Sequence, residues 1–149
     1  MQRWLMKTEP GTFSIDDLEA RGIEPWDGVR NYQARNFIRA MRPGDAVMIY
    51  HSACAEPGVV GLGKVAGAPR PDPTQFDARN GHYDAASRPD DPRWTLVDIA
   101  FARKLKRTIT LDAIKSLPRL GEFALTRRGN RLSVLPVSDR QWRTILTLE

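Results

Sequence analysis

The segment Ala46–Ser52 (AVMIYHS) constrains the fold more than any other part of the sequence, because it is almost continuously apolar and rich in β-forming residues. Such a run is typical of a strand that is covered on both faces of its sheet. Val59–Val65 follows as a predicted partner strand, and its alternating glycines, Gly61 and Gly63, leave one face without side chains. Another group can therefore approach the backbone closely at these glycines.

The chain has 149 residues, of which 41% are hydrophobic and 28% are charged, and this is the composition of an ordinary globular domain. We expect one domain over residues 1–149, since a chain of this length can bury a single core. The longest apolar run, Ala46–Tyr50, is far shorter than the ~20 residues of a membrane-spanning helix, and the first four residues do not resemble a secretory signal. A cytoplasmic protein with no membrane partner is predicted, and a monomer is assumed.

Helix, strand and turn signals divide the chain into short elements. Strands are predicted at Arg3–Lys7, Ala46–Ser52, Val59–Val65 and Trp94–Arg103. Helices are predicted after Ser14, from Asn31 to about Met41, around Leu111–Leu117 and after Ser138. Residues 68–93 hold five prolines and predict a long irregular segment, here called the excursion, and loops of this length are often functional. The residues alone thus support a mixed α and β domain with at least three strands.

The formal charge of +5 is concentrated near the end of the chain. Residues 101–149 carry eleven Lys and Arg against four Asp and Glu, whereas residues 1–60 and 61–100 each carry one more acidic than basic side chain. A concentrated positive region attracts polyanions by releasing counterions from phosphates. A basic but solvated surface is an equally good interpretation. For the arginines expected on one face of the helix that begins at Asn31, the solvated interpretation is preferred: Arg35, Arg39 and Arg42.

The segment Arg127–Val134 contains a two-residue turn signal, Gly129-Asn130, between β-prone flanks. This pattern predicts a hairpin in which Arg128 lies directly opposite Arg131. Like charges facing each other across two strands repel. Either both side chains turn into solvent, or an anion such as phosphate lies beside them.

Nucleophile and metal chemistry receive little support from the sequence. The single cysteine, Cys54, lies close to His51, but a lone cysteine is commonly inert, and the other histidine, His82, is in the excursion. The spacing of these three residues matches no zinc motif. We therefore predict no catalytic residue, no metal and no cofactor.

Four segments, taken in order along the chain, resemble the EVE domain family: WLMKTEP (residues 4–10), WDGVRNYQARN (26–36), YHS (50–52) and RRGNRLSV (127–134). The resemblance extends nearly from end to end of the sequence. It implies an α+β fold of the PUA-like type, a small mixed β-barrel flanked by short helices, related to the YTH readers of methylated RNA. It also implies a non-enzymatic module that binds a modified base, for example a methylated or hydroxymethylated one, in DNA or RNA.

Base recognition accounts for the residue types in these segments. An unstacked base needs flat apolar faces and a few polar groups that read its edge. The residues expected to supply the faces are Trp26, Tyr32 and Tyr50. The residues expected to read the edge are Thr8, Asn31, His51 and Ser52. The cations expected to bind phosphates are Lys7, Arg30, Arg128 and Arg131.

Two of these residues have a structural interpretation that competes with the functional one. Tyr50 on a buried strand is a candidate for the core, and His51 is a candidate for a structural histidine. The other tryptophans, which we assign to the core, are Trp4, Trp94 and Trp142. Two other functions stay open: an enzyme acting on a nucleotide or base, with His51 or Asp27 as acid or base, and a protein-interaction module that uses the excursion.

Overall fold

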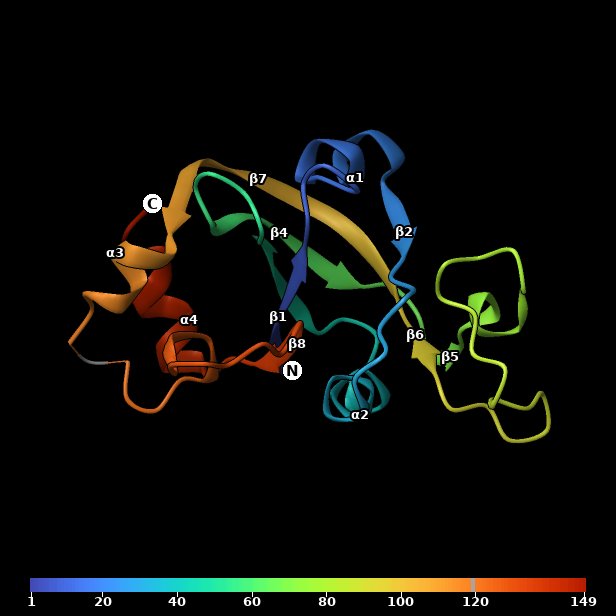
Figure 1. Cartoon of the computed structure of the whole chain (residues 1–149). Helices are drawn as coiled ribbons and strands as arrows, with labels where there is room; N and C mark the ends of the chain where they lie inside the picture. Colours follow the sequence, from blue (N-terminus) through green and yellow to red (C-terminus); the bar gives the residue numbers. More distant parts are fainter. Residues whose placement is uncertain (119) are drawn as a thin grey trace.

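A mixed β-sheet curls through the molecule as a half-barrel (Figure 1), and the computed structural model describes residues 1–118 and 120–149. Within these residues, the sheet comprises β1 (Arg3–Thr8), β2 (Ile23–Pro25), β3 (Ala46–His51), β4 (Gly58–Val65), β7 (Asp98–Thr110) and β8 (Val134–Pro136). A second, two-stranded sheet comprises β5 (Arg70–Pro71) and β6 (Thr95–Leu96). The short helices are α1 (Ile15–Arg21), α2 (Tyr32–Ala40), α3 (Leu111–Lys115) and α4 (Asp139–Leu146).

The order of the strands in the large sheet is β2-β7-β4-β3-β1-β8. Strands β1 and β3 are parallel, and every other neighbouring pair is antiparallel. A parallel pair needs a crossover connection, and here that connection contains α1, β2 and α2. The arrangement confirms the predicted α+β class and the PUA-like barrel with flanking helices.

Strand β3 is covered on both faces, as its apolar sequence predicts. Val47 and Ile49 belong to one hydrophobic cluster, which includes residues of α1 and α2. Met48 and Tyr50 alternate with them and belong to a second cluster, which includes residues of α3 and α4. Because side chains alternate along a strand, β3 supplies the wall between two small cores.

The predicted helix starts are confirmed by the side chains that cap them. Ser14 and Asp17 form a reciprocal capping box at α1, and Ser138 and Gln141 form another at α4. Asn31 accepts the backbone N–H of Ala34 at the start of α2. Each cap satisfies N–H groups that the first turn of a helix leaves without a partner.

The glycines of β4 serve internal packing. A Cβ at Gly61 would collide with the side chain of Ile15 on α1, and a Cβ at Gly63 would lie 2.8 Å from the carbonyl oxygen of Ala100 on β7. The predicted close approach is confirmed, and the approaching groups come from α1 and β7.

Two predictions about strands are wrong. The strand predicted to end at Arg103 continues to Thr110, because β7 pairs with β4 as far as Gly58. The hairpin predicted within residues 127–134 is not formed. Residues 127–133 are a loop, and β8 pairs with β1 instead.

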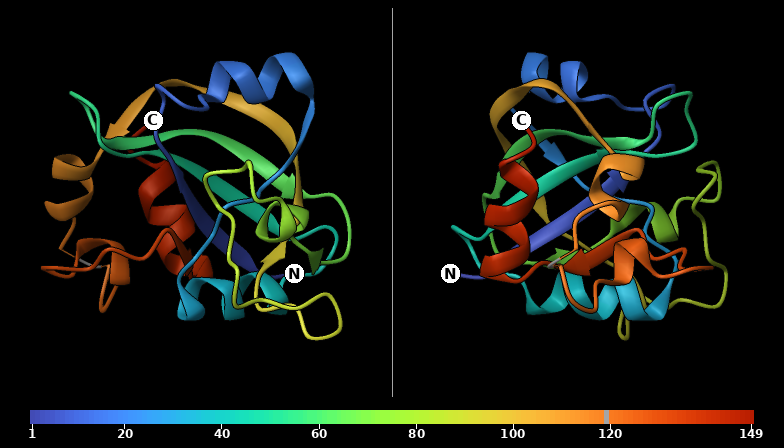
Figure 2. Two further views of the ribbon diagram at one scale, coloured as in Figure 1. Left: turned by 45° about the vertical axis from the view of Figure 1, so that its right-hand side comes forward. Right: turned by 90° about the vertical axis from the view of Figure 1, so that its left-hand side faces the viewer.

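The excursion is an ordered layer at the opposite end of the molecule from α3 and α4 (Figures 1 and 2). Its centre is the buried Gln75, which bonds to the main chain of Asp72 and Trp94 and to the hydroxyl of Ser87.

Two arginines of α2 attach this layer to the rest of the molecule. The guanidinium of Arg35 donates to the carbonyl of Arg93, and that of Arg39 donates to Thr95. The predicted solvated face of α2 is therefore a binding face for the excursion.

Candidate functional site

Two adjoining hollows bring together most of the residues predicted for the site. The first, here called the Trp26 pocket, has a volume of about 430 Å³. It is lined by Lys7, Thr8, Glu9, Thr12, Phe13, Glu24, Pro25, Trp26, Asp27, Gly28, Val29, Arg30, His82 and Ser133. The second, here called the arginine groove, has a volume of about 520 Å³. It is lined by Asn31, Gln33, Phe37, Ala124, Arg127, Arg128, Gly129, Asn130, Arg131, Leu132 and Pro136.

Trp26 lies where the chain leaves β2 and turns toward α2. Its backbone N–H donates to the carbonyl of Val97 at 2.9 Å, and its ring meets Phe13 edge to face, with 5.9 Å between centroids. The residue is 7% exposed and belongs to the first hydrophobic cluster. Trp26 is thus both a core residue and a wall of the pocket.

The excursion closes the pocket at Gly28. This glycine has a φ of +79°, and a Cβ there would lie 2.6 Å from Nε2 of His82. Its N–H donates to the carboxylate of Asp72 at 2.9 Å. Sequence reasoning missed His82 and Asp72, and the one local signal for them was a glycine in a turn, where a positive φ is tolerated.

The guanidinium of Arg30 is fully hydrogen-bonded within the protein. Its guanidinium donates to the carbonyl oxygen of His82 through two N–H groups, to Asp72, to the hydroxyl of Thr74 and to the carbonyl of Val29. Five hydrogen bonds account for all five donors of a guanidinium. The structure therefore gives this predicted phosphate-binding residue the role of holding the excursion against the pocket.

The carboxylate of Asp72 is fully buried and accepts hydrogen bonds from Arg30, Gly28 and Thr74. Burial alone would raise the pKa of Asp72, but hydrogen bonds from Thr74, Gly28 and Arg30 outweigh it and hold the pKa below its usual value.

Asp27, at the rim of the pocket, has a pKa that is shifted in the opposite direction. Burial and the neighbouring charge of Asp72 raise the pKa of Asp27, and its carboxylate forms no hydrogen bond within residues 1–118 and 120–149.

Lys7 and Trp26 are among the pocket residues whose side-chain donors have no partner in the described part of the chain. The ammonium of Lys7 lies over the ring of Tyr50, 5.6 Å from its centroid, and partial burial lowers the pKa of Lys7. Among the described residues, the one fully buried side-chain nitrogen or oxygen without a partner is Nε of Arg3. The indole N–H of Trp26, which also forms no hydrogen bond there, is therefore accessible to solvent. By contrast, the hydroxyl of Thr8 donates to the carbonyl of Phe13 at 2.7 Å.

The arginine groove is built on a short loop next to the start of α2. Gly129 turns this loop with a φ of +77°, and the side chain of Asn130 bonds to the carbonyl of Ala124 and the N–H of Leu132. Three arginines line the groove without an ion pair to any described residue: Arg127, Arg128 and Arg131. Arg128 and Arg131 therefore line the same hollow, although the predicted hairpin is absent.

Four predicted site residues line neither hollow. Tyr32 is 50% exposed and stacks on Trp94, with 4.8 Å between ring centroids. Tyr50 is 3% exposed in the second cluster, and burial raises its pKa to about 12. Nε2 of His51 accepts the N–H of Ile15 at 3.1 Å, which is the structural role weighed above. The fourth, Ser52, donates its N–H to the carbonyl of Thr8 at the end of β1.

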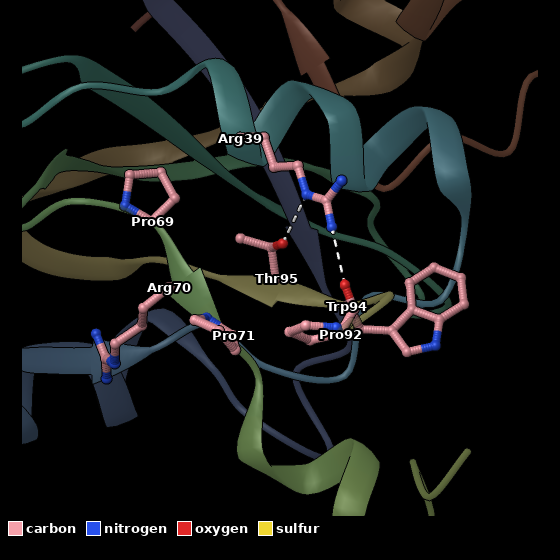
Figure 3. Close-up of a pocket in the computed structure, with 7 residues that line it drawn as sticks. All are labelled: Arg39, Pro69, Arg70, Pro71, Pro92, Trp94 and Thr95. Carbon is pink, nitrogen blue, oxygen red and sulfur yellow. Dashed lines mark hydrogen bonds between the residues drawn. The ribbon is translucent and has the colours of Figure 1, made fainter. Parts of the chain in front are cut away.

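A further hollow lies between α2 and the excursion (Figure 3) and has a volume of about 380 Å³. None of the residues predicted for the site lines it. Its two arginines are already engaged, because Arg39 donates to Thr95 and Arg70 forms an ion pair with Asp98 at 2.6 Å. The predicted core assignment of Trp94, which lines it, is consistent with its low exposure.

Within 1–118 and 120–149, no group of three His, Cys, Asp or Glu side chains is placed to hold a metal ion. The helices formed by these residues are also too short or too polar to cross a membrane.

Comparison with known proteins assigns the chain to a group of relatives. Residues 2–148 match the EVE domain family. Thymocyte nuclear protein 1 of mouse is 44% identical over 166 residues, which cover 98% of this chain and 73% of that protein. A crystal structure from Pseudomonas syringae is 45% identical, with a TM-score of 0.95 over 98% of both chains. Human THYN1 protein, crystallised in complex with 5-methylcytosine-containing DNA, is 42% identical, with a TM-score of 0.91 over 99% of this chain and 97% of that chain.

Proposed function

Because this chain belongs to the EVE domain family, we propose that it is a non-enzymatic module that binds DNA carrying a modified cytosine. The whole chain, residues 1–149, acts as one domain in this proposal. The Trp26 pocket takes the modified base, and the arginine groove takes the phosphates beside it. The support from relatives is the human THYN1 protein, whose crystal structure contains 5-methylcytosine DNA.

The observation that carries the proposal is the position of the two hollows next to each other. The Trp26 pocket and the arginine groove share the segment that leads into α2, since Arg30 lines the first and Asn31 the second. They also share the loop before β8, through Ser133 and Leu132. A base turned out of a duplex stays attached to its backbone, so its pocket and its phosphate site must adjoin in this way.

The size and chemistry of the Trp26 pocket suit a single base. Its volume of about 430 Å³ lies within the range of roughly 300–1,000 Å³ that ligand pockets occupy. Apolar surface comes from Trp26, Phe13 and Val29, and polar groups come from Lys7 and Asp27. Apolar faces replace the stacking that a base loses, and polar groups read its edge.

The proposal assigns different roles to the residues predicted from the sequence. Trp26, Lys7 and Thr8 contribute to the base pocket, and Arg128 and Arg131 bind phosphates. Asn31 contributes by capping α2 at the edge of the groove. The residues that act at a distance, by holding these elements in place, are Arg30, Tyr32, Tyr50, His51 and Ser52.

The direct test is the binding of DNA duplexes that differ by a single methyl group. Fluorescence anisotropy with otherwise identical duplexes is expected to show tighter binding of 5-methylcytosine than of cytosine. Trp26→Phe keeps an aromatic core residue but removes the indole N–H, and we expect it to weaken binding of the methylated duplex. Trp142→Phe is the matched control, since Trp142 is also buried but lies in the second cluster.

Two results would contradict the proposal. One is equal binding of both duplexes by the unchanged protein together with no effect of Trp26→Phe. The other is conversion of the methylated oligonucleotide to a new product during incubation, because that is the outcome an enzyme predicts. A matched RNA carrying the same base is included, and tighter binding of that RNA than of DNA would transfer the proposal to RNA.

A further inference from the structure

We propose that Asp27 makes the Trp26 pocket selective for a pyrimidine with an amino group at position 4 over one with an oxygen there. Cytosine bases carry the amino group, and thymine and uracil carry the oxygen. The inference rests on the proposed function, because it assigns a specificity-determining residue within the same pocket.

Of the carboxylates that line the pocket, those of Asp27 and Glu9 form no hydrogen bond to a described residue, and Asp27 follows directly after Trp26 in the sequence. The carboxylate of Glu24 accepts a hydrogen bond from Arg21 at 2.8 Å, and that of Asp72 is buried and already shared by three residues. The carboxylate of Asp27 lines the pocket and forms no hydrogen bond to any described residue. An acceptor in this position has its lone pairs free for a donor on the ligand.

The main chain holds Asp27 firmly in place. Its N–H donates to the carbonyl of Pro25 at 3.0 Å, and the next residue, Gly28, donates to the buried Asp72. On the other side, Trp26 is fixed by its bond to Val97 and its contact with Phe13. A reading group on such a rigid segment keeps its geometry when a ligand enters.

Asp27 is exposed at the rim of the pocket, and a base bound there would displace water from its carboxylate. A charged acceptor that loses water without gaining a donor is costly. The amino group at position 4 of cytosine supplies N–H donors, and pairing of Asp with this group is an established mode of base recognition. The oxygen at position 4 of thymine would instead bring a second acceptor against the carboxylate, so the pocket would reject thymine by leaving a charge unpaired.

The remaining polar groups of the pocket complement the rest of the cytosine edge. Cytosine presents two further acceptors, its ring nitrogen N3 and its oxygen O2. The donors of lining residues that form no hydrogen bond to a described residue include the ammonium of Lys7, the indole N–H of Trp26 and the hydroxyls of Thr12 and Ser133. These donors can serve the two acceptors of the base, and the carboxylate of Asp27 can accept from its amino group.

The test compares 5-methylcytosine with thymine, because both carry the 5-methyl group and they differ at position 4. Each base is placed opposite an abasic site in the same duplex, so that the strength of base pairing does not affect the comparison. The unchanged protein is expected to prefer 5-methylcytosine by roughly 5- to 150-fold. Asp27→Asn is expected to reduce this preference below about threefold, since an amide can donate as well as accept.

Asp90→Asn is the matched control, because Asp90 is an exposed acid of the excursion that pairs with Arg88. The preference of this variant for 5-methylcytosine over thymine should equal that of the unchanged protein. Asp27→Ala, a second variant, should lose affinity for 5-methylcytosine without gaining affinity for thymine. The inference is overturned if the unchanged protein shows no preference, or if Asp27→Asn retains the full preference while its melting temperature is normal. Equal binding of 5-methylcytosine and cytosine by the unchanged protein would contradict the proposed function itself, and this is a separate measurement.

Discussion

The Trp26 pocket and the arginine groove adjoin, but they are stabilised in different ways. The walls of the pocket are joined by a buried network in which Asp72 connects Gly28, Arg30 and Thr74. The arginines of the groove form no ion pair within the described chain, and their loop is held mainly by Gly129 and Asn130. A rigid pocket suits discrimination between similar bases, whereas unpaired cations suit binding of any phosphate backbone. Under the proposed function, we therefore expect specificity to depend on the pocket and affinity to depend on the groove.

The largest expected effect follows from removal of the centre of the buried network. Asp72→Ala leaves the guanidinium of Arg30 and the N–H groups of Gly28 and Thr74 without their acceptor. We expect the free energy of unfolding, measured with urea, to fall by about 3–5 kcal/mol. Asp90→Ala, which breaks an exposed pair with Arg88, should leave it nearly unchanged. Equal losses in both variants would contradict the central role of Asp72.

A smaller effect is expected from a methyl group at Gly28. Gly28→Ala forces a residue with a side chain into positive φ and into the ring of His82, so we expect a loss of roughly 1–3 kcal/mol and weaker discrimination of 5-methylcytosine. Gly129→Ala is the matched control, because Gly129 has nearly the same φ but open space where its Cβ would lie. Its loss of stability should be smaller, and its base preference unchanged. A larger loss at Gly129 would contradict the role of His82 as a pocket wall.

The smallest expected effect is a dependence of base preference on pH. Burial and Asp72 raise the pKa of Asp27, so acidification protonates Asp27 before an ordinary aspartate. We expect the preference for 5-methylcytosine over thymine to fall as the pH is lowered toward that raised pKa, because a neutral carboxyl is a poorer acceptor. The preference of Asp27→Asn should stay constant over the same range. A parallel fall in both proteins would assign the effect to another group.

Stability is expected to respond to pH with opposite signs at the two aspartates. A pKa raised by folding, as at Asp27, means that the folded state binds the proton more readily, so protonation of Asp27 favours the fold. A pKa lowered by folding, as at Asp72, gives a contribution that is complete above the unfolded value and is lost as the pH falls through the lowered value. Urea unfolding of Asp72→Asn should therefore show a smaller loss of stability in acid than the unchanged protein. The loss that remains is expected from the other carboxylates whose pKa values are lowered, among them Asp45 and Glu149.

Local patterns predicted the elements well, because caps and alternation act over a few residues. Ser14 and Ser138 start helices through partners three residues away, and Ala46–His51 forms a strand because of its own apolar side chains. The same alternation could have corrected the predicted site. Tyr50 and His51 are consecutive on one strand, so they point to opposite faces and cannot line one pocket.

The rest of the site could not be predicted, because it depends on contacts between distant parts of the chain. His82 and Asp72 lie more than 40 residues from Gly28 in the sequence and contact it only because the excursion packs against the segment before α2. The hairpin prediction at Gly129-Asn130 failed for a related reason, since the edge of β1 competes for β8, and the side chain of Asn130 satisfies its own loop. Family resemblance supplied the type of fold but not these contacts.

The most direct test of separate roles for the pocket and the groove measures binding of 5-methylcytosine and cytosine duplexes over a range of salt concentrations. For the unchanged protein and for Arg128→Ala/Arg131→Ala, we compare the slope of log affinity against log salt and the ratio of the two affinities. Arg140→Ala is the control, because Arg140 is exposed on α4 and lines neither hollow. The account predicts that the double variant loses about two units of slope while its methylation ratio is unchanged. A methylation ratio that falls with an unchanged slope would contradict it.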